Sequence, residues 1–235
     1  MSGEAAAEQR PDHSAIHSMP FNARRSGVPI IRELGHVEYV PTWRAMQEFT
    51  ANRDANTADE LWLLEHPPVY TVGVAGRREH LPHAATPVPV VSIDRGGQIT
   101  YHGPGQVVVY TLLDLQRRGL GVRPLVRLLE RAVIDLLGHH GIRAEGRADA
   151  PGVYVDGAKI AALGLRIRHG RCYHGLALNV DMDLGPFGLI DPCGYPGMRV
   201  TQARDLGIGA PAESIGRALT SIIAQHLETA VEAAK

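Results

Sequence analysis

Short alternating apolar segments predict a series of β-strands from residue 28 onward. Segments of this kind, separated by turn residues, are typical of strands that bury one face. The sequence shows them at residues 61–64, 69–74, 88–93, 106–113 and 173–180. The last of these follows the polar turn Arg168-His169-Gly170-Arg171. Between residues 153 and 160, two short apolar runs flank Asp156-Gly157, a pair that favours a type I′ hairpin turn.

Two other segments have the periodicity of amphipathic helices. The first follows Pro124 and ends near Gly138 or Gly141, since proline suits a first turn and glycine a helix end. The second begins at about Ser214, which the pattern favours as the N-cap. The apolar faces consist of Leu125, Leu128, Leu129, Ala132, Val133, Leu136 and Leu137 in the first helix, and Ile215, Ala218, Leu219, Ile222, Ile223 and Leu227 in the second.

Hairpins together with two packed helices predict an α+β fold with a mixed or antiparallel sheet, rather than a doubly wound parallel one. The 235 residues, 44% of them hydrophobic, fit one domain with one active site. We expect this catalytic domain to span residues 28–235. Residues 1–27 have no apolar segment of the signal-peptide kind, and we expect a mobile tail there.

Charge and cysteine content narrow the class of function. The net charge is −1, from 24 Lys and Arg against 25 Asp and Glu, so the sequence predicts neither nucleic-acid nor membrane binding. The two cysteines, Cys172 and Cys193, are too few for a disulfide scaffold, which favours a reducing, cytoplasmic setting. His66 and His102 could orient a ligand or transfer a proton, but no zinc-binding spacing is present, and we expect no metal.

Cys193 is the candidate nucleophile. It lies in Ile190-Asp191-Pro192-Cys193-Gly194-Tyr195-Pro196-Gly197, where two prolines and two glycines favour an irregular loop that presents the thiol. The alternative is a small buried hydrophobe, which free cysteines often are. Cys172 favours that structural interpretation, because the alternation places it on one strand face with His174, Leu176, Leu178 and Val180.

Lys159 occupies an unusual position for a lysine. Counting by twos along its strand places it with Ala161, Leu163, Leu165 and Ile167, on the apolar face. A thiolate nearby would favour the ammonium, and the ammonium would in turn lower the cysteine pKa. Alternatively, Lys159 simply reaches solvent at the strand end beside the Asp156-Gly157 turn.

A glycine-rich run, residues 95–106, precedes the strand at 106–113. Its glycines would allow the backbone to approach a ligand closely and to offer N–H groups. The run matches neither a dinucleotide fingerprint nor a phosphate loop, and its glycines could be purely structural.

Together these motifs resemble the lipoyl(octanoyl) transferase family, the octanoyl-[acyl carrier protein]:protein N-octanoyltransferases of lipoate biosynthesis. The resemblance covers roughly residues 30–220. The six stretches that carry it, in the family's order, are Glu60–Pro68 (ELWLLEHPP), Arg95–Gln106 (RGGQITYHGPGQ), Arg147–Tyr154 (RADAPGVY), Lys159–Arg166 (KIAALGLR), His174–Asn179 (HGLALN) and Asp191–Gly194 (DPCG).

The resemblance implies a two-step acyl transfer. Cys193 would take the octanoyl group from octanoyl-acyl carrier protein and pass it to the lysine of an apo lipoyl domain, in 2-oxoacid dehydrogenases or the glycine cleavage H protein. Lys159 would lower the pKa of Cys193 and move protons. No cofactor is implied, and we expect a monomer. The implied substrate-binding residues are Arg95, Gly96, Gly97, Gln98, Ile99, Thr100, Tyr101, His102, Ala162, Leu163, Gly164, Gly175, Leu176 and Ala177. The family's fold is similar to the catalytic domains of biotin and lipoate ligases.

Three other functions remain open at the level of the residues. An ATP-dependent lipoate or biotin ligase would use a lysine but would not require Cys193. A cysteine thioesterase would acylate Cys193 and release free octanoate to water. A non-enzymatic acyl-binding module would bind the chain without any covalent adduct.

Overall fold

The computed structural model describes residues 27–147, 150–191 and 197–233. Its main sheet has seven strands, and only the pair β1–β2 is parallel. In spatial order these strands are β1 (Ile30–His36), β2 (Glu60–Glu65), β6 (Gln106–Asp114), β10 (Arg171–Asn179), β9 (Ala158–Arg168), β8 (Gly152–Val155) and β7 (Glu145–Gly146). The predicted tail lies outside the described residues, apart from Gly27.

A smaller, three-stranded sheet lies beside the first. Its order is β4 (Val90–Ser92), β3 (Val69–Val72) and β5 (Ile99–His102), with β3 parallel to β4 and antiparallel to β5. Both sheets therefore contain parallel and antiparallel pairs, and the predicted mixed α+β class is confirmed.

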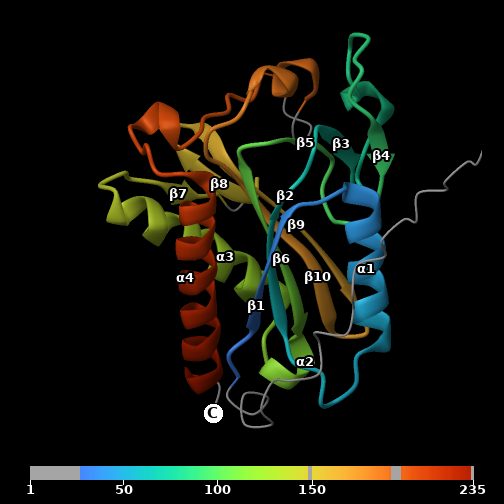
Figure 1. The fold of residues 1–235 in the computed structure, drawn as a ribbon, viewed down its shortest axis with the longest axis vertical. Coiled ribbons are helices and arrows are strands. Elements are labelled where there is room, and N and C mark those ends of the chain that lie inside the picture. The colour runs from blue at the N-terminus through green and yellow to red at the C-terminus, as the bar shows by residue number, and fades with distance from the viewer. Residues whose placement is uncertain (1–26, 148–149, 192–196, 234–235) are drawn as a thin grey trace, which may run out of the picture.

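Helices cover both faces of the main sheet (Figure 1). α3 (Val122–His139) and α4 (Ala212–Ala233) pack together on one face, and α1 (Tyr39–Asn52) packs on the other. Four short helical segments lie in the connections of the described chain: η3 (Arg78–His80) between β3 and β4, α2 (Leu115–Arg118) between β6 and α3, and η4 (Gly185–Leu189) and η6 (Arg204–Leu206) between β10 and α4. None of the helices in the described ranges is long and apolar enough to cross a membrane.

Period-two burial on the central strands explains the layered core. On β6, Val107 and Val109 belong to the cluster formed with α3 and α4, whereas Val108 and Tyr110 belong to the cluster formed with Met46 of α1. Because both faces are covered, β6 reads as an almost unbroken apolar run, which is why the sequence predicted it clearly.

The two predicted hairpin turns are confirmed. Asp156 and Gly157 have φ values of 49° and 75°, and His169 and Gly170 have 49° and 73°. Positive φ at both central residues is the requirement of a type I′ turn, and its twist matches that of the flanking strands. β8, β9 and β10 thus follow one another as an antiparallel meander.

Several local predictions differ from the structure. The last helix begins at Ala212, and the Ile215 N–H bonds to the Pro211 carbonyl, so Ser214 lies inside the first turn and is not the N-cap. Residues 99–102 form strand β5 inside the predicted glycine-rich loop. β1 and α1 were not predicted.

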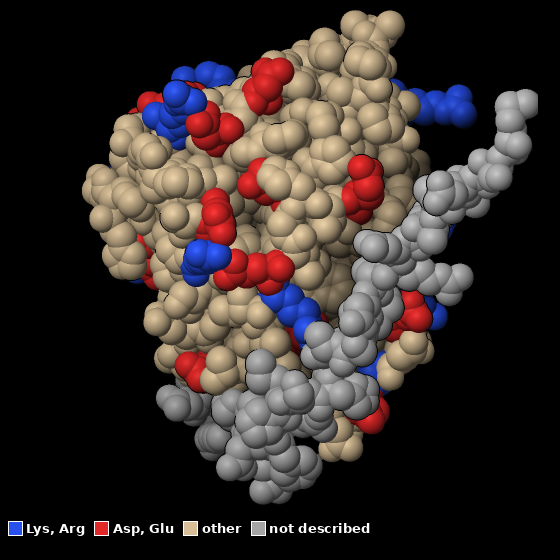
Figure 2. All heavy atoms as spheres, in the orientation of Figure 1, with Lys and Arg blue, Asp and Glu red and all other residues tan. Residues whose placement is uncertain are grey.

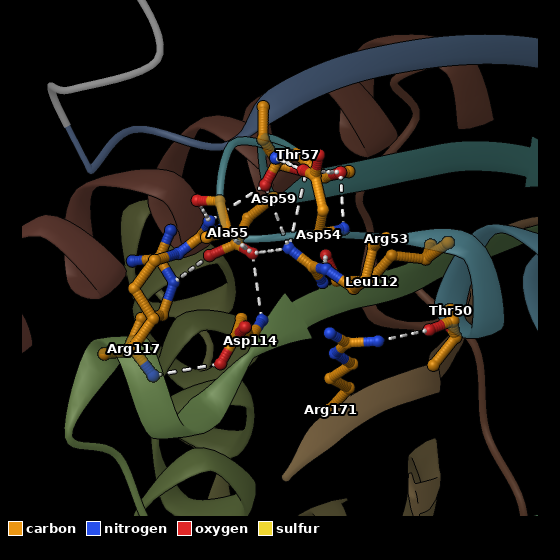
Figure 3. Close-up of polar contacts among 12 residues, drawn as sticks. Thr50, Arg53, Asp54, Ala55, Thr57, Asp59, Leu112, Asp114, Arg117 and Arg171 are labelled. Atoms are coloured by element: carbon orange, nitrogen blue, oxygen red, sulfur yellow. Dashed lines mark hydrogen bonds and ion pairs between the residues drawn. The ribbon is translucent and has the colours of Figure 1, made fainter. Parts of the chain in front are cut away.

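A buried carboxylate, Asp59, ties the segments at one end of the main sheet together (Figure 3). It accepts hydrogen bonds from Arg53 at the end of α1, from Arg117 and Arg118 of α2, and from the Asp114 backbone at the end of β6. Burial alone would raise the pKa of Asp59, but the arginines and the backbone N–H lower it below its ordinary value.

On the face seen in Figure 2, acidic and basic side chains are interspersed over a largely uncharged surface. This arrangement agrees with the small net charge of −1.

Candidate functional site

One pocket lies between the two sheets, on the α1 side of the main sheet. Its walls come from α1, the turn before β5, β5 itself, β6, β9 and β10. The lining residues are Tyr39, Arg95, Gly97, Gln98, Ile99, Thr100, His102, Val108, Tyr110, Ala162, Leu163, Gly164, His174, Gly175, Leu176 and Ala177.

The structure brings all three predicted substrate-binding stretches together in this pocket. Ala162–Gly164 on β9 and Gly175–Ala177 on β10 are paired across the sheet, Gly164 with Gly175 and Ala162 with Ala177. Two of the predicted residues do not line it. Gly96 bonds through its N–H to the Leu165 carbonyl, and Tyr101 packs on the far side of β5 against Tyr70 and Phe187.

Arg95 braces the wall where the small sheet meets β9. Its guanidinium donates to the Thr71 carbonyl oxygen at 2.6 Å and to the Thr71 hydroxyl at 2.9 Å, and to the Gly96 carbonyl at 2.9 Å. Its stem leaves no room beside Gly164, where an added Cβ would lie 2.9 Å from Arg95 Cδ. Glycine at position 164 therefore lets the arginine pack against β9.

Two buried histidines are held neutral in the pocket region. His66 Nδ1 donates to the Val37 carbonyl at 2.7 Å, so its Nε2 accepts from the Tyr110 hydroxyl, also at 2.7 Å. His102 Nδ1 lies 2.7 Å from Gln106 Oε1. Burial lowers the pKa of His66 to about 4 and that of His102 to about 3. Neither can be a general base that ionises near neutral pH.

His174 and Asp94 form a second polar cluster at the pocket. His174 Nε2 lies 3.0 Å from Asp94 Oδ1, and Asp94 also accepts from Tyr173, from Trp43 at 2.8 Å and from Gln47 at 3.2 Å. Burial alone would raise the pKa of Asp94, but these hydrogen bonds together hold it well below its usual range. Asp94 is therefore a carboxylate that fixes α1 against β10.

The prediction that His174 shares a strand face with Cys172, Leu176 and Leu178 is wrong. Cys172, Leu176 and Leu178 pack with α3 and α4, but the His174 ring stacks on Tyr173, on the α1 side. The reason is a left-handed backbone at His174, with φ 62°, inside β10. Such a conformation is strained for a residue other than glycine, and it brings a histidine to the pocket.

Lys159 is buried, with 4% of its surface exposed, so the solvent-reaching alternative is wrong. The predicted alternation of side chains along the Lys159 strand is also interrupted. Tyr154 pairs with Lys159 and Val153 with Ala161, which leaves Ile160 as a one-residue bulge. Ile160 and Ala161 consequently both pack into the α3–α4 cluster.

A second, smaller cavity lies between Lys159 and residues of the main pocket. It is lined by Lys159 and also by Thr100 and Ala162, which line the main pocket as well. The Lys159 Nζ lies 3.5 Å from the Pro151 carbonyl oxygen and 5.3 Å from the centre of the Tyr154 ring. The amine thus lies beside the space between the two sheets.

The predicted nucleophile, Cys193, lies outside the described residues. Six to eight residues further along the chain, the backbone pairs with Lys159: the Lys159 N–H donates to the Arg199 carbonyl at 2.8 Å, and the Thr201 N–H donates to the Lys159 carbonyl at 3.0 Å. The other thiol, Cys172, is fully buried, and burial raises its pKa to about 12. Cys172 is a core residue, as predicted, and a poor nucleophile.

Sequence reasoning missed four polar residues at this site: Tyr39, Asp94, Tyr110 and His174. Tyr39 could not be placed because α1 was not predicted, and Asp94 directly precedes the glycine-rich run without any spacing signal of its own. His174 stands at the start of a motif that was singled out, HGLALN, which was the available signal. Within the described ranges, no group of three or more His, Cys, Asp or Glu side chains is arranged to hold a metal ion.

Comparison of the sequence with known families gives a match over most of the chain. The model of the lipoyl protein ligase A/B catalytic domain matches residues 38–223. An octanoyltransferase of Thiobacillus denitrificans is 69% identical over 194 residues, which are 83% of this chain and 88% of that protein. An octanoyltransferase of an Azoarcus species is 60% identical over 198 residues, or 84% and 86% of the two chains.

Two solved structures with a similar fold are ligases. A lipoate-protein ligase A bound with ATP superposes with a TM-score of 0.67 at 15% identity, covering 85% of each chain. A biotin protein ligase from Aquifex aeolicus, in complex with biotin and ATP, has a TM-score of 0.57 at 14% identity, covering 86% of this chain and 72% of the other. At such low identity the likeness extends to the fold alone.

Proposed function

Because the chain belongs to the lipoyl protein ligase A/B catalytic-domain family and is an acyltransferase of its octanoyltransferase group, we propose a two-step octanoyl transfer through Cys193. The donor is octanoyl-acyl carrier protein. The acceptors are apo lipoyl domains of 2-oxoacid dehydrogenases and the glycine cleavage H protein. The enzyme acts as a monomer in the cytoplasm.

The pocket supports this proposal because most of its depth is apolar. Ile99, Val108, Ala162 and Ala177 supply walls on which an alkyl chain can lose its contact with water. Thr100 and Ala162 line both this space and the cavity beside Lys159, so the two cavities are adjacent. An octanoyl chain bound between the sheets therefore has its thioester end at Lys159.

The position of Lys159 is the observation that carries the proposal. It is buried beside the acyl space, and its backbone bonds on both sides to Arg199 and Thr201, just beyond the Cys193 loop. Cys193 and Arg199 are only six residues apart in the sequence, which is close enough to allow the proposed contact between the thiol and the amine. A cationic amine beside Cys193 favours the thiolate, and the neutral amine can accept the thiol proton.

Each half-reaction balances without a cofactor. In the first, the Cys193 thiolate attacks the donor thioester, and the carrier thiol leaves with a proton relayed by Lys159. In the second, the acceptor amine attacks the Cys193 thioester and loses a proton through Lys159, and the Cys193 thiol is regenerated. The first exchange conserves a thioester bond, and amide formation drives the second.

A transfer assay with two cysteine variants tests the proposal. Cys193→Ala should abolish transfer, whereas Cys172→Ser should retain most of it, because Cys172 is enclosed in the core. Normal turnover by Cys193→Ala would contradict the proposed mechanism. Transfer that needs ATP and free octanoate would favour a ligase, and octanoate release without an acceptor would favour a thioesterase.

A further inference from the structure

Glu130 is a charged residue on the buried face of α3. It is 9% exposed and shares that face with Leu129, Val133 and Leu137. A carboxylate in such a place costs free energy unless it has partners. Its Oε1 accepts a hydrogen bond of 2.9 Å from the Gly152 N–H, at the start of β8.

The peptide group that Glu130 binds is the one that Lys159 approaches. The Gly152 N–H and the Pro151 carbonyl belong to a single peptide unit, and the Lys159 Nζ lies 3.5 Å from that carbonyl oxygen. A carboxylate on the N–H side polarises the peptide and makes its carbonyl a stronger acceptor for an ammonium. Glu130 and Lys159 are therefore linked through one rigid planar group.

Gly152 allows this close arrangement. Its φ is 148°, and an added Cβ would lie 2.8 Å from the Ala161 carbonyl oxygen and 3.1 Å from Lys159 Cε. A side chain at this position would push the lysine stem away from the peptide. Glycine thus brings β8 onto the lysine that it helps to hold.

Other charged and titratable groups also face this region. Arg127 of α3 acts on Glu130, the Arg147 guanidinium lies 5.1 Å from the Tyr154 ring that Lys159 also contacts, and the Arg199 backbone bonds to Lys159. Burial raises the pKa of Glu130, partly opposed by the Gly152 N–H and by the charges of Arg127 and Lys159. The attraction is reciprocal, so an ionised Glu130 favours the Lys159 ammonium against its cationic neighbours.

We propose that Glu130 is a positioning residue: through the 151–152 peptide and by its charge, it holds Lys159 as an ammonium at the end of the acyl pocket. This role rests on the function proposed for Lys159, because the ammonium then stabilises the Cys193 thiolate. Glu130 acts only through Lys159 and contacts neither the substrate nor the Cys193 thiol.

The lysine content of the chain makes the test direct. Lys159 is one of only two lysines, and the other is the last residue, Lys235. Protein labelled with ¹³C at the lysine ε-carbon should give two signals, one for each lysine. The Lys159 titration midpoint is compared in the wild-type protein, in Glu130→Gln, and in Glu48→Gln, a matched loss of charge at an exposed site on α1.

Glu130→Gln keeps an oxygen acceptor for the Gly152 N–H but removes the charge. The Lys159 midpoint should fall by about one pH unit, as expected for the loss of a nearby opposite charge. The Lys235 signal and the Glu48→Gln protein should show no shift. A Lys159 midpoint unchanged in folded Glu130→Gln would overturn the proposal.

The wild-type protein provides a second measurement that does not depend on the variant folding. The Lys159 ¹³Cε signal should move again on the acid side, as Glu130 protonates, at a midpoint above glutamate's ordinary 4.5. If the Lys159 signal showed no second titration, the proposed action of the Glu130 charge on Lys159 would also be contradicted. Neither readout needs turnover, so inactive Glu130→Gln with an unshifted Lys159 refutes the positioning role, whereas active Cys193→Ala refutes the proposed function.

Discussion

At the scale of single residues, the central feature is a lysine fixed from several sides. Lys159 is held by its strand, by backbone bonds to Arg199 and Thr201, and by the Tyr154 ring and the 151–152 peptide. The chain uses arginine for 22 of its 24 basic residues, and arginine keeps its proton in proteins, so a lysine at this position agrees with the proposed proton transfer.

Two substitutions separate the charge of Lys159 from its proton transfer. Lys159→Met removes both and should slow acylation of Cys193 by roughly 10²–10⁴-fold. Lys159→Arg keeps a positive charge that does not titrate, so iodoacetamide should still modify Cys193 rapidly while transfer stays slow. Stopped-flow acylation and alkylation rates measure the two effects. If Lys159→Met were acylated on Cys193 at the wild-type rate, the Lys159 amine would have no role in the mechanism.

The buried histidines predict acid sensitivity. Above about pH 6.5, His66 and His102 are neutral in both the folded and unfolded states and have no linkage effect. Below that pH the unfolded chain binds protons that the folded protein excludes, until pH reaches the folded pKa values of about 4 and about 3. The free energy of unfolding should therefore fall by about 1.4 kcal/mol per pH unit for each histidine.

Urea denaturation at several pH values between 7.5 and 4.5 checks this slope. His102→Gln, which removes one of the two groups, should flatten the pH dependence relative to the wild-type protein. An identical slope in the two proteins would show that His102 titrates normally in the fold.

At the scale of elements, the pocket depends on how closely β10 approaches β6. A Cβ added at Gly175 would lie 2.0 Å from the Val109 carbonyl oxygen, a backbone atom that cannot move alone. Gly175→Ala should force these central strands apart, cost at least about 1–3 kcal/mol of stability and reduce acylation. Gly138→Ala in α3, where nothing lies within 4 Å, is the matched control and should be neutral or stabilising. Equal stability of the two variants would contradict this packing.

Helices and strands with a regular pattern of apolar residues could be predicted from the sequence. Elements whose position depends on tertiary contacts could not. β6 and α3 have continuous or periodic apolar faces. β1 is an edge strand with most positions exposed, and α1 buries two threonines among its four buried residues, so neither shows a clear pattern. The glycine-rich stretches of the site were recognisable, but the left-handed His174 and the Ile160 bulge depend on neighbouring strands.

At the scale of the whole molecule, the Asp59 cluster joins segments far apart in the chain. Arg118 extends it to the Gly27 carbonyl before β1, and Arg53 to the Leu112 carbonyl on β6. Asp59→Asn would leave three guanidinium groups without their shared carboxylate and should lower stability by about 3–5 kcal/mol. Thermal denaturation measures the loss. Because Asp59 is remote from the lining of the pocket, the folded variant should keep its acylation rate, and a selective loss of activity would contradict a structural role.

Intact-protein mass spectrometry with peptide mapping can detect the proposed covalent intermediate on Cys193. The enzyme is mixed with octanoyl-acyl carrier protein, and an apo lipoyl domain is then added. We expect an octanoyl adduct on Cys193 that disappears as the lipoyl-domain lysine gains the group. Transfer to the lipoyl domain with no adduct on Cys193, appearing only when ATP and free octanoate are supplied, would contradict it.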